Sequence, residues 1–245
     1  MDKSEYLRMY HLETKFWWYK VLHELVDFTI RKNKQEGKIS ILDAGCGTGR
    51  MMEINQKYGT VTGIDYSEDA VYYAKKRGLE NIEMGDLNDY QFEKGAYDVV
   101  VCLDVLYHSA IQNDIAIVEK FYHTLKDDGI LIINLPAFEY LKRSHDLVVH
   151  TKRRYRKKPF ENDLKETGFT ILRSGYRMPL LYFIILIAKL FPKKSKSDES
   201  KSDLKELPVW LNTLLLNYGR LENWCLKQGF AFPVGSSLFV VAKKG

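Results

Sequence analysis

The chain has 245 residues, of which 45% are hydrophobic and 28% charged, and its formal net charge is +5. This composition suits one large α/β domain and excludes an intrinsically disordered chain. The three cysteines are widely spaced and form no C-x-x-C pattern, so the sequence predicts neither a disulfide framework nor a zinc site. Residues 1–6 are polar and lack the apolar core of a secretion signal, which together with the cysteine pattern indicates a reducing cytoplasm.

Residues 11–33 are expected to form one amphipathic helix, because apolar side chains recur there near a 3.6-residue period. This helix carries two adjacent tryptophans, Trp17 and Trp18. One interpretation is an aromatic anchor that packs the helix on the domain. The other makes residues 1–38 a helical lid over the cofactor, with Trp17 and Trp18 as substrate-binding residues.

A glycine-rich loop follows the first predicted strand. Ile39, Ile41 and Leu42 form a short apolar run that predicts a buried strand, and Gly45, Gly47 and Gly49 come directly after it. Glycines permit positive φ angles and let a ligand approach the backbone closely. Open α/β sheets bind nucleotides at such a succession of strand, glycine loop and helix start.

Two acidic residues define the expected ligand. Asp43 ends the first strand, and Asp65 ends the next one, Val61 to Asp65. The glycines also depart from the G-x-G-x-x-G spacing of dinucleotide-binding proteins. A carboxylate at Asp43 would repel a pyrophosphate but suits a cationic ammonium group, while Asp65 is placed to accept hydrogen bonds from ribose hydroxyls. These features predict a ligand with a ribose and a cationic amino acid but no phosphate.

The pattern Leu42–Gly49 followed by Gly63–Asp65 resembles the class I S-adenosylmethionine-dependent methyltransferases. The resemblance implies S-adenosyl-L-methionine as cofactor and S-adenosyl-L-homocysteine as product. It places Asp86 and Leu87 beside the adenine, with a strand-end cap as the alternative for Asp86. His108 is expected in the cofactor pocket, with a general base and a structural histidine as alternatives. The expected cofactor-binding residues are Asp43, Gly45, Cys46, Gly47, Gly49, Asp65, Tyr66, Asp86, Leu87, Leu103, Asp104 and His108.

Strands and helices alternate along the remaining sequence, which predicts a parallel sheet with right-handed crossovers. We expect a Rossmann-like, doubly wound α/β fold with a seven-stranded sheet, mostly parallel with an antiparallel last strand. The methyltransferase domain would comprise residues 39–176 and 236–245, with a helical insertion at 177–235. Helices are expected at 67–77, 110–126, 160–166, 179–190 and 207–228, and further strands at 81–86, 96–103, 130–135, 169–172 and 238–242.

Residues 142–158 contain eight lysines and arginines but one acid, a local charge of +7 against −2 for the rest of the chain. This segment follows the fifth strand, at the sheet edge where substrates bind. The expected catalytic residues are His145, His150 and Tyr155, with a histidine as general base, and Arg153 and Arg154 would bind a phosphate or carboxylate of the acceptor. A solvated basic loop is the alternative. The neighbouring cations disfavour a metal site, and the shortness of the patch disfavours nucleic acid.

The helical insertion begins with an apolar run, Met178 to Ala188, which is too short to span a membrane. In one interpretation this helix packs on the second insertion helix as a substrate lid. In the other it lies in the membrane interface, with Lys193, Lys194 and Lys196 near anionic lipids. The following segment, Pro192 to Asp203, has the composition of a mobile solvated linker.

The order His-Asp followed by His-x-x-Arg-Arg-Tyr in residues 145–155 is similar to a methyltransferase subgroup of polysaccharide and lipid-linked glycan pathways. We therefore expect methyl transfer to oxygen of a small-molecule, glycan or lipid-linked acceptor. The protein would be cytoplasmic, without a transmembrane segment, and peripheral membrane contact is a further hypothesis. The alternatives are an RNA or protein methyltransferase and a non-catalytic cofactor-binding partner protein.

Overall fold

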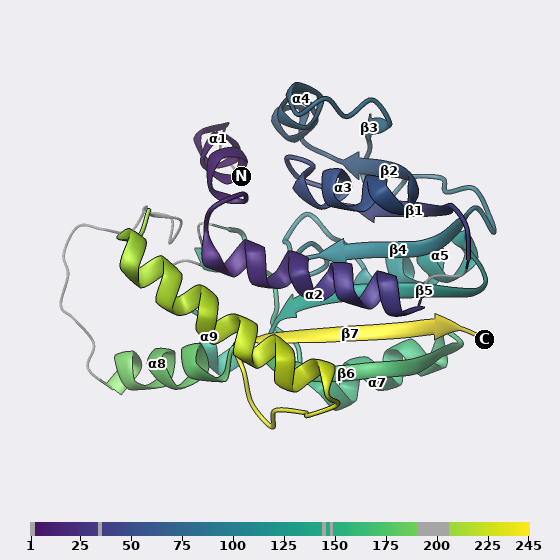
Figure 1. Ribbon diagram of the computed structural model, residues 1–245. Coiled ribbons are helices and arrows are strands. Elements are labelled where there is room, and N and C mark those ends of the chain that lie inside the picture. The colour runs from purple at the N-terminus through teal and green to yellow at the C-terminus, as the bar shows by residue number, and fades with distance from the viewer. Residues whose placement is uncertain (1–2, 34–35, 144–145, 148, 191–205) are drawn as a thin grey trace.

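The computed structural model describes residues 3–33, 36–143, 146–147, 149–190 and 206–245 (Figure 1). A seven-stranded sheet with the order β3-β2-β1-β4-β5-β7-β6 forms its centre. Strand β7 is antiparallel to both β5 and β6, and the remaining neighbours are parallel, which confirms the predicted sheet. The strands are β1 Ile39–Ala44, β2 Gly59–Asp65, β3 Ile82–Met84, β4 Tyr97–Leu103, β5 Leu125–Pro136, β6 Phe169–Arg177 and β7 Ser237–Lys244.

Helices cover both faces of the sheet. Figure 1 shows α2 and α9 crossing one face, while α5 and α7 lie behind the sheet. Side chains of β1 alternate between the two apolar clusters, with Ile41 on the α2 face and Leu42 on the α5 face. The helices are α1 Lys3–Leu12, α2 Trp17–Asn33, α3 Arg50–Asn55, α4 Glu68–Lys76, α5 Asp114–Thr124, α7 Lys157–Glu166, α8 Pro179–Leu190 and α9 Val209–Lys227, with 3-10 turns η1 Gln56–Tyr58 and η2 Glu139–Leu141.

The N-terminal region differs from the sequence-based prediction. Instead of one helix over 11–33, α1 ends at Leu12 and α2 begins at Trp17. The turn between them is closed by the Phe16 N–H, which donates to the Leu12 carbonyl at 2.7 Å. In this turn the Glu13 side chain is buried. Apolar periodicity continues through the turn and therefore could not reveal the break.

The helical insertion lies between β6 and β7, and the predicted first helix has the bounds observed for α8. Its expected packing against α9 is largely wrong. Leu181 and Leu215 do pack around Trp17, but most of the apolar side chains expected at this contact are exposed. The exposed side chains are Leu180, Phe183, Ile184, Ile187, Trp210, Leu214 and Leu221.

Helix α9 packs on α2 instead. The Asn223 side chain donates a hydrogen bond to the Val21 carbonyl at 2.8 Å. Gly219 permits the close approach, because a Cβ at this position would lie 2.6 Å from a Val21 methyl group. None of the described helices combines the length and apolarity that a membrane crossing requires. The predicted linker, Pro192 to Asp203, lies outside the described residues.

We predict that Gly219→Ala destabilises the protein despite the better helix propensity of alanine. The added methyl would overpack the contact with Val21, and overpacking costs about 1–3 kcal/mol. Denaturant titration of the single variants and of Gly219→Ala/Val21→Ala measures the coupling. The double variant should lose less unfolding free energy than the two single variants together. Simple additivity would contradict the proposed close contact.

Candidate functional site

The glycine loop lies between the carboxyl end of β1 and helix α3. Gly45, Gly47 and Gly49 all have positive φ angles, at 79°, 54° and 83°. The N–H groups of Gly45 and Cys46 both donate to the Ile64 carbonyl, at 2.7 and 3.0 Å, which ties the loop to the end of β2. At Gly45 a Cβ would lie 2.3 Å from a Val105 methyl group, so the end of β4 also requires glycine here.

The two acidic strand ends predicted as ligand contacts lie at this loop. Asp65 accepts hydrogen bonds from the backbone N–H groups of Gly47 at 2.9 Å and Ser67 at 3.0 Å. Asp43 is only 2% exposed, and its Oδ2 atom has no hydrogen-bond partner among the described residues. Burial, and then the nearby carboxylates of Asp65 and Glu13, raises the pKa of Asp43 to about 7. A buried group of carboxylates disfavours anions and favours a cationic group.

Helix α1 lies over the glycine loop. The Met9 sulfur lies 3.2 Å from the position that a Gly47 Cβ would take. Tyr6 is buried beside Asp65, and its burial followed by the Asp65 charge raises the pKa of the phenol. Residues of α1 therefore lie against the glycine loop and Asp65.

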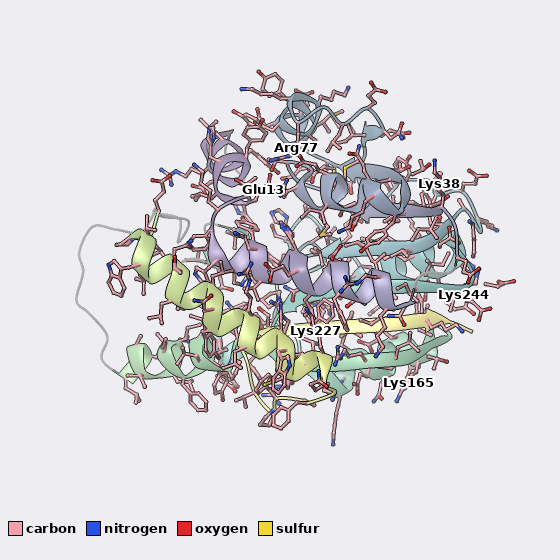
Figure 2. The ribbon with its side chains drawn as sticks, in the orientation of Figure 1. Glu13, Lys38, Arg77, Lys165, Lys227 and Lys244 are labelled. Carbon is pink, nitrogen blue, oxygen red and sulfur yellow. The ribbon has the colours of Figure 1, made fainter. Side chains whose placement is uncertain are left out.

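Glu13 fastens the turn after α1 to the loop. Its carboxylate accepts hydrogen bonds from the Thr48 hydroxyl and from Arg77, and Arg77 Nε donates to the Thr48 carbonyl at 3.0 Å. Figure 2 shows Glu13 and Arg77 facing one another between α1 and α4. Burial outweighs both partners and raises the pKa of Glu13 to about 7. Sequence reasoning missed this cluster, because its members are 29 to 64 residues apart.

A second polar cluster, formed by Asp104, Asn134 and Arg177, lies near the carboxyl ends of β4, β5 and β6. Asp104 has a φ angle of 57°, a strained conformation that is common at functional sites. The Asn134 amide donates to both Asp104 carboxylate oxygens at 3.0 Å, and Arg177 donates to Asn134 Oδ1 at 3.2 Å. Burial raises the pKa of Asp104 to about 7, although Asn134 and Arg177 oppose the shift. Asp104 was predicted here, whereas Asn134 and Arg177 were not.

The structure brings together His108 and His150. Their ring centroids are 5.6 Å apart, and the Tyr66 ring lies 6.2 Å from His108. The Ser109 N–H donates to the His150 carbonyl at 2.8 Å, which joins the two loops. His108 Nδ1 accepts the Ala110 N–H at 3.1 Å, so a neutral His108 carries its proton on Nε2. Burial lowers the pKa of His108, which keeps this ring neutral near pH 7. The predicted His145 lies outside the described residues.

Two arginines of the basic segment, Arg153 and Arg154, are held by acidic partners. Arg154 is buried, and its guanidinium donates to both oxygens of Asp146, at 2.8 and 3.0 Å, and to the Ala137 carbonyl at 3.1 Å. Arg153 forms an ion pair with Asp114. The Tyr155 hydroxyl is buried 2.8 Å from the same Asp114 carboxylate. These contacts brace the loop that carries His150, a role that the charge count did not predict.

The remaining predicted site residues differ in their exposure and contacts. Asp86 is exposed and accepts hydrogen bonds from Asn88, whereas Leu87 is buried in the core. The Cys46 thiol and Leu103 belong to the apolar cluster under the loop. Trp17 is buried against α8 and α9, and Trp18 is half-buried on α2. Trp17 thus has the position of the predicted aromatic anchor.

Comparison with known proteins agrees with this arrangement. Residues 42–133 match the family model described as a methyltransferase domain. The chain is 32% identical over 117 residues to the human probable tRNA methyltransferase 9B, which covers 46% of the chain and 25% of that protein. It is 28% identical over 138 residues to the ubiquinone biosynthesis O-methyltransferase of Haemophilus ducreyi, with 48% and 58% covered. The chain thus spans about a quarter to somewhat over half the length of these relatives.

A solved structure with the same fold is phosphoethanolamine N-methyltransferase 2 of Haemonchus contortus in complex with S-adenosyl-L-methionine. It has a TM-score of 0.59 and 18% sequence identity, and the similarity covers 90% of this chain and 52% of that one. The matched family segment runs from β1 to β5, which includes the glycine loop, Asp65 and Asp104. Residues 42–133 of the chain thus match a methyltransferase domain, and solved S-adenosylmethionine-dependent methyltransferases share the fold of the chain.

Proposed function

We propose that the protein transfers a methyl group from S-adenosyl-L-methionine to a hydroxyl of a small-molecule, glycan or lipid-linked acceptor. The observation that carries this proposal is the unpartnered Oδ2 of buried Asp43 beside the glycine loop. An ionised carboxylate there fits the ammonium group of the cofactor's amino acid. Asp65 fits the ribose hydroxyls from the next strand end, and the glycine backbone leaves room for close approach.

The bound cofactor supplies a methyl group that its sulfonium already activates, so the protein's task is mainly alignment and exclusion of water. Helix α1 and the Glu13–Arg77 cluster close one side of the pocket. A hydroxyl acceptor must also lose a proton. His108 and His150 stand together at this edge, and His108 Nδ1 is already committed to a backbone N–H. We assign proton acceptance to His150 and the positioning of its loop to Arg154.

The acceptor class rests on the basic segment and on the apolar surface of α8. Arg156 and Lys158 add cations beyond those paired with Asp114, Asp146 and Glu161. On α8, Phe183 and Ile187 are 53% and 57% exposed. A phosphate-linked acceptor with a lipid tail would use both surfaces. The similarity to a tRNA methyltransferase makes RNA the alternative acceptor.

A direct test measures S-adenosyl-L-homocysteine release with a phenol, a polyprenyl-linked glycan and tRNA as acceptors. Turnover with a hydroxyl acceptor supports the proposal. Turnover with tRNA alone would instead support the alternative that the protein is an RNA methyltransferase. Cofactor binding without turnover on any acceptor would favour the non-catalytic partner protein.

Cofactor affinity should rise between about pH 6 and about pH 8, because the raised pKa of Asp43 keeps the carboxyl protonated at the lower pH. Only its ionised form attracts the ammonium group. Calorimetry with S-adenosyl-L-homocysteine at both pH values measures the effect. Asp43→Asn should weaken binding and flatten the Asp43 part of this pH dependence, whereas Asp89→Asn, an exposed control, should change neither. An Asp43→Asn protein with wild-type affinity at the higher pH would refute the assignment.

Removal of the proposed base should slow turnover without loss of cofactor. General bases contribute about 100- to 10,000-fold to rate, so His150→Ala should lower kcat at least that much on a hydroxyl acceptor. Calorimetry of the same variant with S-adenosyl-L-homocysteine should give the wild-type affinity. His123→Ala, a histidine at the end of α5, is the matched control and should keep full kcat. Full kcat in His150→Ala would assign proton acceptance elsewhere.

Exposed apolar residues of α8 should contribute to binding at anionic membranes, since partly inserted apolar side chains and nearby lysines act together. We expect the wild-type protein to pellet with phosphatidylglycerol vesicles at low salt and Ile187→Glu to remain in the supernatant. Tyr72→Glu, at a site 59% exposed on α4, is the control and should pellet normally. If the wild-type protein does not pellet, α8 has no membrane role.

A further inference from the structure

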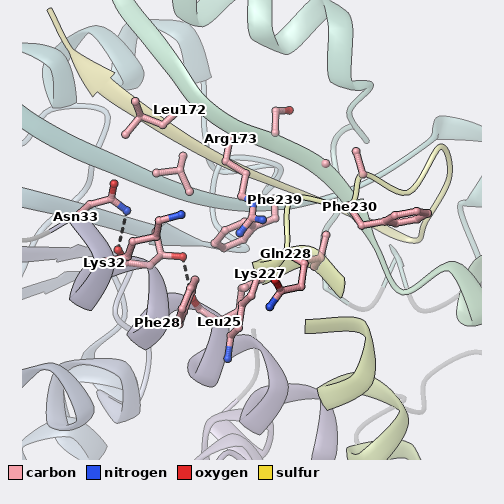
Figure 3. A pocket seen from close by; sticks show the side chains of 17 residues that line it. Leu25, Phe28, Lys32, Asn33, Leu172, Arg173, Lys227, Gln228, Phe230 and Phe239 are labelled. Atoms are coloured by element: carbon pink, nitrogen blue, oxygen red, sulfur yellow. Dashed lines mark hydrogen bonds between the residues drawn. The ribbon is translucent and has the colours of Figure 1, made fainter. Parts of the chain in front are cut away.

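A second pocket lies apart from the cofactor edge, on the α2 face of the sheet. Its volume is about 480 Å³, within the range of small-molecule sites. The C-terminal half of α2, strand β6 and the end of α9 form its walls (Figure 3). Neither the glycine loop nor the basic segment 142–158 contributes a lining residue. The pocket therefore needs an explanation separate from methyl transfer.

The floor of this pocket is apolar. Leu25, Leu226, Phe239 and Val241 all line it and are at most 4% exposed. Figure 3 shows Phe239 in the middle of the lining side chains, below Arg173. An apolar or aromatic ligand body would gain about 25 cal/mol for each Å² that it removes from water on such a floor.

The rim carries three cations and no acid. Lys32 comes from α2, Arg173 from β6 and Lys227 from α9, and no aspartate or glutamate lines the pocket. Lys227 lies 4.8 Å from the centre of the Phe28 ring. Within the described part of the chain, Lys32 and Arg173 form no ion pair. Elsewhere on this sheet lysines meet carboxylates, as Lys126 does with Asp98 at 2.8 Å. The uncompensated positive charge favours an anion.

A β-bulge delivers Arg173 into the pocket. Ile171 pairs with Ala242 and points to the α7 face, and an unbroken strand would place residue 173 on that face too. The pairing shifts by one residue at Leu172, so that Arg173 lies opposite Val241 on the α2 face. Bulges commonly redirect a side chain at functional positions. Solvent exposure alone does not require the bulge, because a regular edge strand would also leave an arginine in contact with solvent.

We propose that this pocket binds an organic anion with a phosphate or carboxylate group and a flat apolar body. The anionic group would lie between Lys32 and Arg173, which approach from two different elements. The apolar body would lie against Phe239 and Leu226. Arg173 supplies the planar fork of donors that suits carboxylate and phosphate oxygens.

Calorimetry with 1-naphthyl phosphate, on the full chain saturated with S-adenosyl-L-homocysteine, tests the proposal. Saturation blocks the cofactor site without touching the second pocket. We expect one binding event per chain, and inorganic phosphate should bind at least about tenfold more weakly because it lacks the apolar body. Arg173→Gln and Lys32→Gln should each weaken binding of the naphthyl probe by at least about tenfold, since each removes a charge-assisted hydrogen bond.

Lys165→Gln, at an exposed lysine on α7, is the matched control and should bind the probe like the wild type. Unchanged affinity for S-adenosyl-L-homocysteine in all three variants shows that they are folded. The proposal is overturned if the probe does not bind, or if Arg173→Gln and Lys32→Gln leave its affinity unchanged. Because the readout is binding at a separate pocket, failure here says nothing against methyl transfer.

Discussion

The geometry of the proposed cofactor site depends on one hydrogen-bond acceptor, the carbonyl of Ile64. It receives the N–H groups of both Gly45 and Cys46 and thereby holds the loop after β1 to the end of β2. This connection brings Asp43 and Asp65 to one pocket although they lie on different strands. A residue with a side chain could not replace Gly45, because the φ angle there is positive and a Cβ would clash with Val105. Backbone hydrogen bonds and glycine conformations thus determine the shape of this loop.

Burial has an electrostatic cost at this edge of the sheet. Asp43, Glu13 and Asp104 are carboxyl groups whose pKa values are all raised to about 7, chiefly by desolvation. A folded-state pKa above the ordinary value means that these groups destabilise the fold as the pH rises from about 4 to about 7. A cationic ligand offsets that cost when it binds. Of the three, only Asp43 has an oxygen without a hydrogen-bond partner among the described residues, so it is the acid that a cation could still reach.

Much of the fold could be predicted from the sequence because local patterns determine it. Continuous apolar runs such as Val99–Cys102 mark buried parallel strands, and the glycine loop is contiguous in the chain. The break between α1 and α2 could not be predicted, since apolar periodicity continues through it. Charge counting identified the basic segment but not that Arg154 is bound by Asp146, because pairing depends on where each side chain lies. The bulge at Leu172 likewise has no sequence signal.

The cluster of Asp104, Asn134 and Arg177 shows the same limit at the site itself. Asp104 follows β4, Asn134 lies near the end of β5 and Arg177 ends β6, so only the strand order places them side by side. Asp104 was recognisable because it follows a buried strand at the expected sheet edge. Asn134 reads as an ordinary polar residue in an apolar strand, and Arg177 lies where the sequence suggests only the start of the insertion.

The pairing of Arg177 with Ser237 has a consequence for how this protein could diversify. The chain leaves β6 and re-enters β7 at adjacent backbone positions, and Gly235 lies close against the Arg177 backbone. The residues between these two points form an insertion that begins and ends at neighbouring positions of the sheet. Its length can change at little entropic cost, because loop closure depends only weakly on length. The fold thus separates the length of this insertion from the geometry of the sheet, which both strands re-enter at one fixed position.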